Sequence, residues 1–146
     1  MAAATRDRVT ELKDTQNQIE TRYAVAASTT IYKGTLVMLN TSGYLIPAAD
    51  TVNCKVVGIA DEKVVNSGSA GDATCRVISN VTAKLAASSV AIGNLDAPLL
   101  YVVDDQTVDE TTPANSVKAG IHVSPFISAT EAWVFIPAYG VHTFGL

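Results

Sequence analysis

Short runs rich in β-branched and aromatic residues, separated by glycine, asparagine, aspartate, serine and proline, dominate this chain after its first twenty or so residues. Such spacing is typical of strands joined by tight turns, and no stretch has the length and the period of about 3.6 residues that mark a firm helix. Strands are expected at 21–26, 36–39, 44–47, 55–60, 73–81, 99–103, 116–124 and 131–136. The sequence therefore predicts an all-β fold of about eight short strands, either a small β-barrel or a β-sandwich.

The connections between these runs carry their own signals. Residues 40–43 read as the turn of a hairpin that joins two of the strands. A flexible loop is expected at 66–72, a short helical or irregular piece at 84–88, and a turn or exposed loop in the acidic stretch at 104–113.

A chain of 146 residues is long enough for one core and too short for two comfortable ones. We expect three parts: an extended N-terminal arm at 1–20, a β-rich domain at 21–137 and a C-terminal docking tail at 138–146. The arm is polar and only weakly apolar in spacing, so we expect it to become ordered on binding. The tail carries Tyr139 and Phe144 without an evident partner, so we expect it to dock on a neighbouring chain.

The composition favours an oligomer. Hydrophobic residues make up 48% of the chain and charged residues only 16%, which predicts an apolar surface that a partner covers. A net charge of −4 argues against nucleic acid as a partner. No run reaches the roughly 18–20 apolar residues of a membrane span, and residues 1–14 lack a signal-peptide core. We therefore expect synthesis in the cytoplasm and no membrane partner.

Cys54 and Cys75 are too few and too far apart for a zinc ribbon, which needs paired cysteines at close spacing. Free thiols are the first expectation for a protein made in the cytoplasm. A disulfide between these two residues, within or between chains and formed after the protein leaves the cell, is the alternative, because both are assigned to predicted strands that can be neighbours.

Residues with catalytic chemistry are sparse, and we expect no enzyme activity, cofactor or metal. His122 lies in a predicted strand, where it is expected to point to the outer face or an interface, and His142 lies in the tail. Glycines 68 and 71 are not followed by the Lys-Ser/Thr of a phosphate-binding loop. The acidic group matches no EF-hand spacing and reads as a solvated turn instead of a calcium site or a glycosidase pair; it comprises Asp104, Asp105, Asp109 and Glu110.

A series of short motifs occurs in a characteristic order along the body. They are Lys33-Gly34-Thr35-Leu36-Val37, Gly43, Pro47, Val57-Gly58-Ile59-Ala60, Gly71-Asp72, Gly93, Leu99-Leu100-Tyr101-Val102-Val103-Asp104-Asp105, Ala119-Gly120-Ile121 and Ala132-Trp133-Val134-Phe135-Ile136. This order, over about residues 20–137, resembles the small head decoration, or cement, proteins of tailed phages. The N-terminal arm is longer than that pattern.

The resemblance implies a β-rich trimer on the outside of the expanded capsid, where it locks subunits of the major capsid protein together. It implies no catalytic residue. An arm of twenty extended residues can reach about 65 Å, far enough to cross onto an adjacent capsid subunit. Candidate capsid contacts are Arg6, Arg8, Val9, Leu12, Ile19, Arg22 and Tyr23, and candidate oligomer contacts are Trp133, Phe135, Tyr139 and Phe144.

Two other functions stay open. The first is a carbohydrate-binding or host-adhesion module on the virion surface, with Trp133, Tyr101 or Tyr44 as stacking platforms. The second is a small hydrolase that uses the acidic group.

Overall fold

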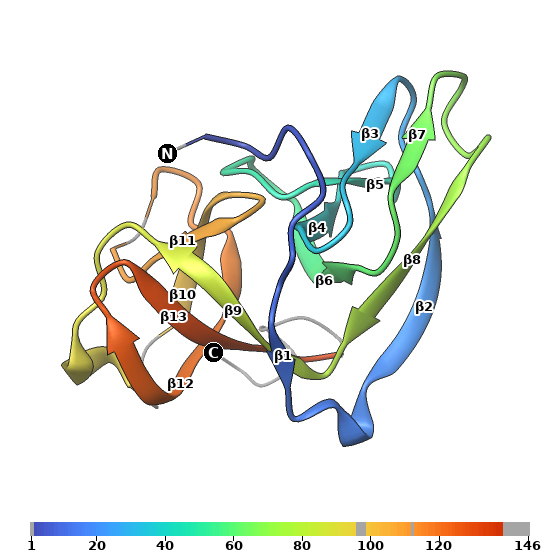
Figure 1. Ribbon diagram of the computed structural model, residues 1–146. Helices are drawn as coiled ribbons and strands as arrows, with labels where there is room; N and C mark the ends of the chain where they lie inside the picture. Colours follow the sequence, from blue (N-terminus) through green and yellow to red (C-terminus); the bar gives the residue numbers. More distant parts are fainter. Residues whose placement is uncertain (1, 96–98, 112, 139–146) are drawn as a thin grey trace.

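The computed structural model describes residues 2–95, 99–111 and 113–138 (Figure 1). Within these ranges the chain forms thirteen strands and two short 3-10 helices, η1 (Thr15–Asn17) and η2 (Ile92–Asn94). The predicted all-β class is confirmed, and the fold combines a small β-barrel with additional sheets. No helix in the described ranges is long and apolar enough to cross a membrane.

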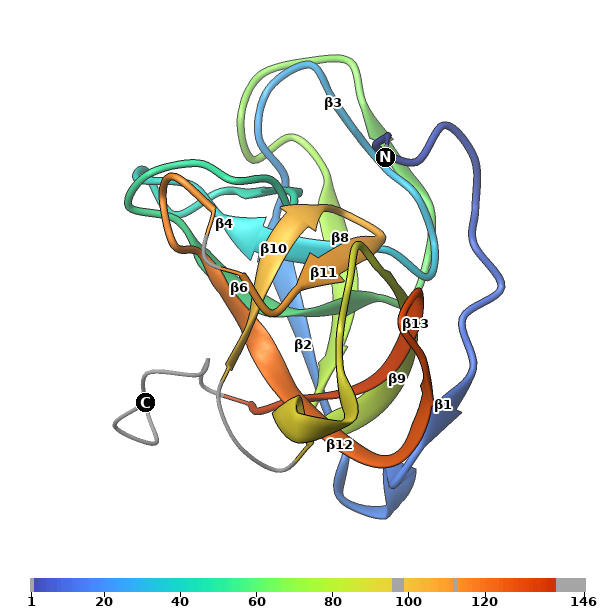
Figure 2. The same cartoon turned by 90° about the vertical axis from the view of Figure 1, so that its left-hand side faces the viewer.

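Five strands form the barrel. They are β9 (Val81–Ala87), β11 (Thr107–Asp109), β10 (Leu99–Asp104), β12 (Lys118–Ser128) and β13 (Glu131–Ile136), in that order around the sheet. The pairing of β13 with β9 closes the barrel, and only the β9–β11 pair among these is parallel. Figure 2 shows these strands wrapped around a common interior.

One edge of β9 is shared by two partners. The first half of β9 pairs with the two-residue strand β1 (Leu12–Lys13), and its last residues pair with β11. The N-terminal segment therefore extends the barrel sheet where β11 does not reach.

A second, antiparallel sheet packs against the barrel, and a two-stranded sheet covers its other face. Its order is β2 (Ile19–Ala24), β8 (Thr74–Ser79), β6 (Lys55–Ala60), β4 (Leu36–Leu39) and β5 (Leu45–Pro47). The two-stranded sheet consists of β3 (Thr29–Ile31) and β7 (Val64–Asn66).

The second sheet is apolar on both faces, because it separates two cores. One core joins the barrel interior, including Leu85 and Val134, to Ile59 of the sheet. The other lies between the sheet and the β3–β7 pair and includes Ile31 and Val77. Burial of these side chains, at about 25 cal/mol per Å² of apolar surface, is the main stabilising term.

Asn80 marks the point where the chain passes from the second sheet into the barrel. It adopts a left-handed conformation with φ of 58° between β8 and β9. Its backbone N–H donates to Ile136 O at 2.7 Å, and its side chain donates to Asn17 O at 2.9 Å. Asparagine tolerates this backbone region better than most residues.

The strands at 36–39, 55–60 and 131–136 have the bounds that the sequence predicted, and the hairpin of β4 with β5 is confirmed. Residues 84–88 were wrongly predicted as helical or irregular, because most of them lie in β9. The predicted acidic loop at 104–113 is also wrong in part, since the β10–β11 hairpin occupies its first half. Strands β1, β3, β7 and β11 were not predicted.

Candidate interaction surface

The N-terminal segment, residues 2–13, lies along the outside of the body in an extended conformation; we call it the strap. Ala4 N–H donates to Asp105 Oδ1 at 2.8 Å, which holds its first residues to the barrel. Arg8 N–H donates to Lys33 O at 2.7 Å, and the Arg8 guanidinium donates to Lys84 O at 3.0 Å. The strap thus contacts both the barrel and the segment leading into β4, and Figure 2 shows it running down one side of the molecule to β1.

Alternate residues of this strap face the body. Arg8, Thr10 and Leu12 are half-buried, and the Thr10 hydroxyl donates to Gly34 O at 2.6 Å. Val9, between two of them, is 100% exposed. Because side chains alternate along an extended chain, one face of the strap is anchored and the other is presented to solvent.

Gly34 allows the strap to approach this closely. Its φ is +83°, which L side chains rarely adopt, and a Cβ at this position would collide with the carbonyl oxygen of Arg8. The same Cβ would stand 2.9 Å from Thr10 Oγ1. A side chain here is therefore incompatible with the observed path of the strap.

Burial of charge accompanies the anchoring. The pKa of Asp105 is raised by desolvation and further by Asp104, while the Ala4 N–H and Arg8 act in the opposite direction. The pKa of Arg8 is lowered by desolvation, against the attraction of Glu131 and Asp105. Arg8 and Asp105 therefore attract each other, while the burial of each charged group costs desolvation free energy.

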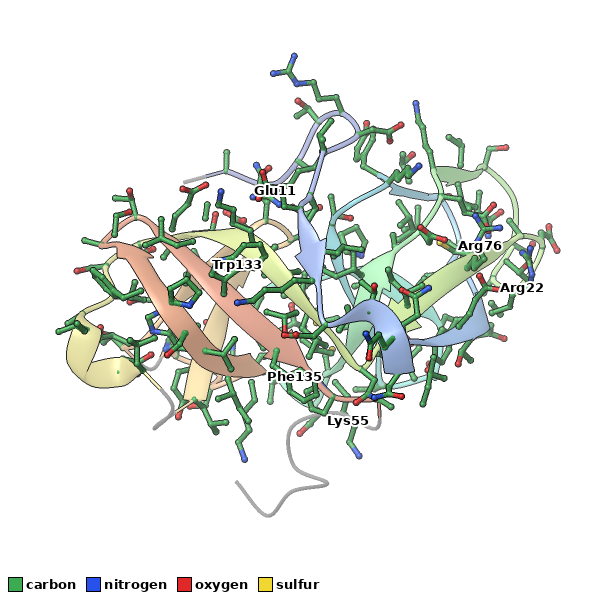
Figure 3. The ribbon with its side chains drawn as sticks, turned by 60° about the horizontal axis from the view of Figure 1, so that its bottom comes forward. Glu11, Arg22, Lys55, Arg76, Trp133 and Phe135 are labelled. Carbon is green, nitrogen blue, oxygen red and sulfur yellow. The ribbon has the colours of Figure 1, made fainter. Side chains whose placement is uncertain are left out.

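Trp133 lies under the end of the strap, on the outer face of the barrel (Figure 3). Its neighbours in β13, Ala132 and Val134, are buried, so the alternation turns Trp133 outward. The Lys13 Nζ atom lies 4.6 Å from the centroid of the Trp133 ring, and that of Lys84 lies 5.8 Å away. These two lysines bring positive charge to the ring at cation–π distances.

The candidate oligomer contacts fall on this outer face as far as the structure describes them. Trp133 and Phe135 are both half-buried and alternate with the inward-facing Val134. Figure 3 shows the two aromatic side chains on the same strand. Tyr139 and Phe144 lie outside the described residues.

The candidate capsid contacts divide between two separate surfaces. Arg6, Arg8, Val9 and Leu12 belong to the strap, and of these Arg6 and Val9 are exposed while Leu12 packs against the main core. The others, Ile19, Arg22 and Tyr23, lie on β2 at the far margin of the second sheet.

His122 is not on an outer face, which corrects the expectation from its strand neighbours. Its side chain is 0% exposed. Nδ1 lies 3.0 Å from Asn94 Oδ1, and the ring lies 6.2 Å from that of Phe126. His122 lies opposite the inward-facing Val134 in the β12–β13 pair, so it shares the buried face, while its apolar neighbours Ile121 and Val123 are only half-buried; this register was not readable from local alternation. His142 lies outside the described residues.

The acidic group is not a solvated turn. Asp104 and Asp105 are buried in the β10–β11 hairpin. Asp109 accepts from Thr111 N–H at 3.2 Å, and Glu110 accepts from Ala91 N–H at 2.6 Å, so each serves a different local contact. Among the described residues no group of three or more His, Cys, Asp or Glu side chains is placed to hold a metal ion.

The two cysteines are free thiols in this chain, which corrects the alternative of an intrachain disulfide. Cys75 belongs to the core between the second sheet and the β3–β7 pair, whereas Cys54 packs against the core shared with the barrel. In the antiparallel register that pairs Ile59 with Ile78, they lie toward opposite ends of the sheet. An interchain disulfide remains a prediction.

A cleft of about 290 Å³ runs beneath the strap. The charged groups among the described residues that line it are Arg8, Lys33 and Asp61.

The sequence did not indicate Lys13, Lys84 or Gly34 as members of this surface. Lys84 lies directly opposite Trp133 in the β9–β13 pair, and Lys13 reaches the ring because β1 pairs with the other edge of β9, a relationship across most of the chain. Gly34 carried a signal as a turn glycine, but nothing marked its contact with Arg8.

Comparison with protein-family models, curated proteins and solved structures gave no match.

Proposed function

We propose that this chain is a structural decoration, or cement, protein of a tailed-phage capsid, which binds the outside of the head as a homotrimer and stabilises contacts between major capsid protein subunits. The observation that carries the proposal is the strap: an extended segment fixed to the body by alternate residues, with Val9 fully exposed between them. On this proposal the protein is made in the host cytoplasm, resides on the virion surface and has no catalytic role.

The strap is suited to bind a protein lattice. β1 is the last strand of its sheet, so its outer edge is available for a strand of another protein. Because the inward residues already hold the segment in an extended conformation, less ordering entropy opposes its association. Val9 adds an apolar side chain that has no contact to lose in the folded body.

A trimer would multiply this interaction. Three weak strap contacts made by one trimer give a much higher effective affinity for the lattice than a single contact does. The half-buried Trp133 and Phe135 provide apolar area on the barrel that a neighbouring copy can cover.

The proposal is tested with Val9→Asp, measured by co-sedimentation with expanded, DNA-free heads of the phage that encodes this chain. Val52→Asp is the matched control, because Val52 is also exposed, at 57%, but lies away from the strap. We expect the Val9 variant to lose at least tenfold in occupancy while the control binds as the unmodified chain does. Equal binding of both variants, or no binding of the unmodified chain to the heads, contradicts the proposal.

A further inference from the structure

The outer edge of β2 is the most open strand edge of the second sheet. β2 has six residues in uninterrupted antiparallel register with β8 and is the terminal strand of the sheet order. Figure 1 shows it at the margin of the sheet. The opposite edge strand, β5, has only three residues and ends in Pro47. Proteins protect exposed edges with short strands, proline, bulges or charged side chains; β2 has no proline or bulge and carries only the oppositely charged Glu20 and Arg22.

The backbone direction of β2 follows from its partner. Arg76 N–H donates to Glu62 Oε2 at 2.8 Å and Arg76 O accepts from Asp61 N–H at 2.9 Å, so both groups point toward β6. Arg22, which lies opposite Arg76, therefore turns its own N–H and C=O away from β8. By alternation, Glu20 and Ala24 do the same. The end of β2 is not free, because Val25 forms a parallel bridge with Leu45 of β5 and Ala26 N–H donates to Leu45 O at 3.0 Å. The open part of the edge is therefore Ile19–Arg22, whose residues are exposed.

We propose that β2 is a contact between two copies of this chain, which pair antiparallel across a two-fold axis at Thr21. Because a closed trimer has no two-fold axis, these two copies belong to different trimers of the proposed assembly. A two-fold axis at Thr21 places Glu20 opposite the partner's Arg22 and Arg22 opposite the partner's Glu20, with Ile19 opposite the partner's Tyr23. Glu20 and the partner's Arg22, whose backbone groups both point outward, then form a hydrogen-bonded pair. Thr21 faces the partner's Thr21 as a non-hydrogen-bonded pair.

The charges select this register from its neighbours. A shift that centres the axis on Arg22 puts two arginines opposite each other, and a shift to Glu20 puts two glutamates opposite each other. Like charges directly opposite are destabilising, whereas opposite charges and apolar pairs directly opposite are stabilising. The edge is therefore complementary to a second copy of itself, which is the condition for a two-fold interface.

The side chains are available for this contact. Arg22 and Glu20 are 57% and 55% exposed, and each already makes one ion pair on its own sheet, with Glu62 at 3.4 Å and Arg76 at 3.3 Å. Pairing would extend these contacts into a continuous network across the axis. On the other face, Ile19 is 39% exposed and would be covered. Figure 3 shows Arg22 and Arg76 together, away from Trp133.

The contact is tested by oxidative cross-linking of the full chain in solution, without heads, so its outcome does not depend on the proposed function. Thr21→Cys is made in a Cys54→Ser background. At the axis the two Cα atoms are about 4.5 Å apart, within the disulfide range of about 4.4–6.8 Å. We expect a disulfide-linked dimer from Thr21→Cys and little from Arg22→Cys or the exposed control Lys55→Cys. Equal cross-linking at all three positions, or preferential cross-linking at Arg22→Cys, overturns the proposal.

Charge reversal provides the second arm. Glu20→Arg alone and Arg22→Glu alone, each combined with Thr21→Cys, put like charges opposite across the axis, so each alone should lose at least tenfold in cross-linked product. A mixture of the two variants restores both opposite-charge pairs and should restore the product as a heterodimer. Because a variant that failed to fold could not be rescued by mixing, no gain in the mixture overturns the two-fold pairing.

Discussion

The Lys13 Nζ atom lies 4.6 Å from the centroid of the Trp133 ring, which joins the end of the N-terminal strap to the last strand of the barrel. The same ammonium donates to Ser124 O at 2.6 Å, so it contacts β12 as well as β13. The single tryptophan of the chain therefore lies where it can report whether the strap is in place.

Lys13→Ala should loosen the end of the strap. A partly exposed cation–π contact contributes about 0.5–1 kcal/mol, and its loss should make Trp133 more accessible. We expect stronger quenching of Trp133 fluorescence by acrylamide, with a red-shifted emission maximum. Lys55→Ala is the control, since Lys55 is exposed on β6 and does not contact the ring. Identical quenching curves for both variants would mean that Lys13 does not shield the tryptophan.

Gly120→Ala should destabilise the barrel. A Cβ at Gly120 would collide with Phe135 O and stand 2.8 Å from Val134 Cγ1, so β12 and β13 could not keep their spacing. Overpacking of this kind costs about 1–3 kcal/mol or more in the free energy of unfolding. Gly93→Ala is the matched control, because a Cβ there meets nothing within 4 Å, and its effect should stay within about 0.5 kcal/mol. Urea unfolding of the two variants decides the point.

Local pattern was sufficient where a strand is apolar and bounded by turn residues, as at Leu36–Leu39 and Glu131–Ile136. It failed in β9, whose Ala83, Ala86 and Ala87 favour helix by intrinsic propensity. Pairing on both edges of β9 overrides that preference.

The candidate site was predictable only in part for the same reason. The polar character of the N-terminal segment follows from composition, whereas the full exposure of Val9 was not predicted. The burial of Asp105 does not follow from composition either, because a run of acidic residues normally indicates solvent. The buried Asp105 carboxylate accepts a hydrogen bond from the N–H of Ala4, which is about a hundred residues away in the sequence.

The two thiols should differ in reactivity. Burial, with a contribution from Glu62, raises the pKa of Cys75 to about 11, so the reactive thiolate is scarce at neutral pH. Cys54 is only half-buried. We expect a thiol reagent such as DTNB to modify one thiol per native chain at neutral pH and the second only on unfolding. The fast phase should vanish in Cys54→Ser; its persistence would show that Cys75 is the accessible thiol.

Asp105→Asn should keep the strap anchored and make stability less dependent on pH. The carboxamide oxygen can still accept from Ala4 N–H, but it carries no charge to desolvate. Because burial raises the folded pKa of Asp105 above its ordinary value of 3.8, its favourable contribution is complete below that value and is lost as the pH rises through the folded pKa. The variant should therefore gain stability relative to the unmodified chain as the pH rises through the acidic range, and the difference should level off toward neutral pH. Urea midpoints measured across that range test this sign, and a difference that is constant or that shrinks with rising pH would show that the charged carboxylate is favoured in the fold.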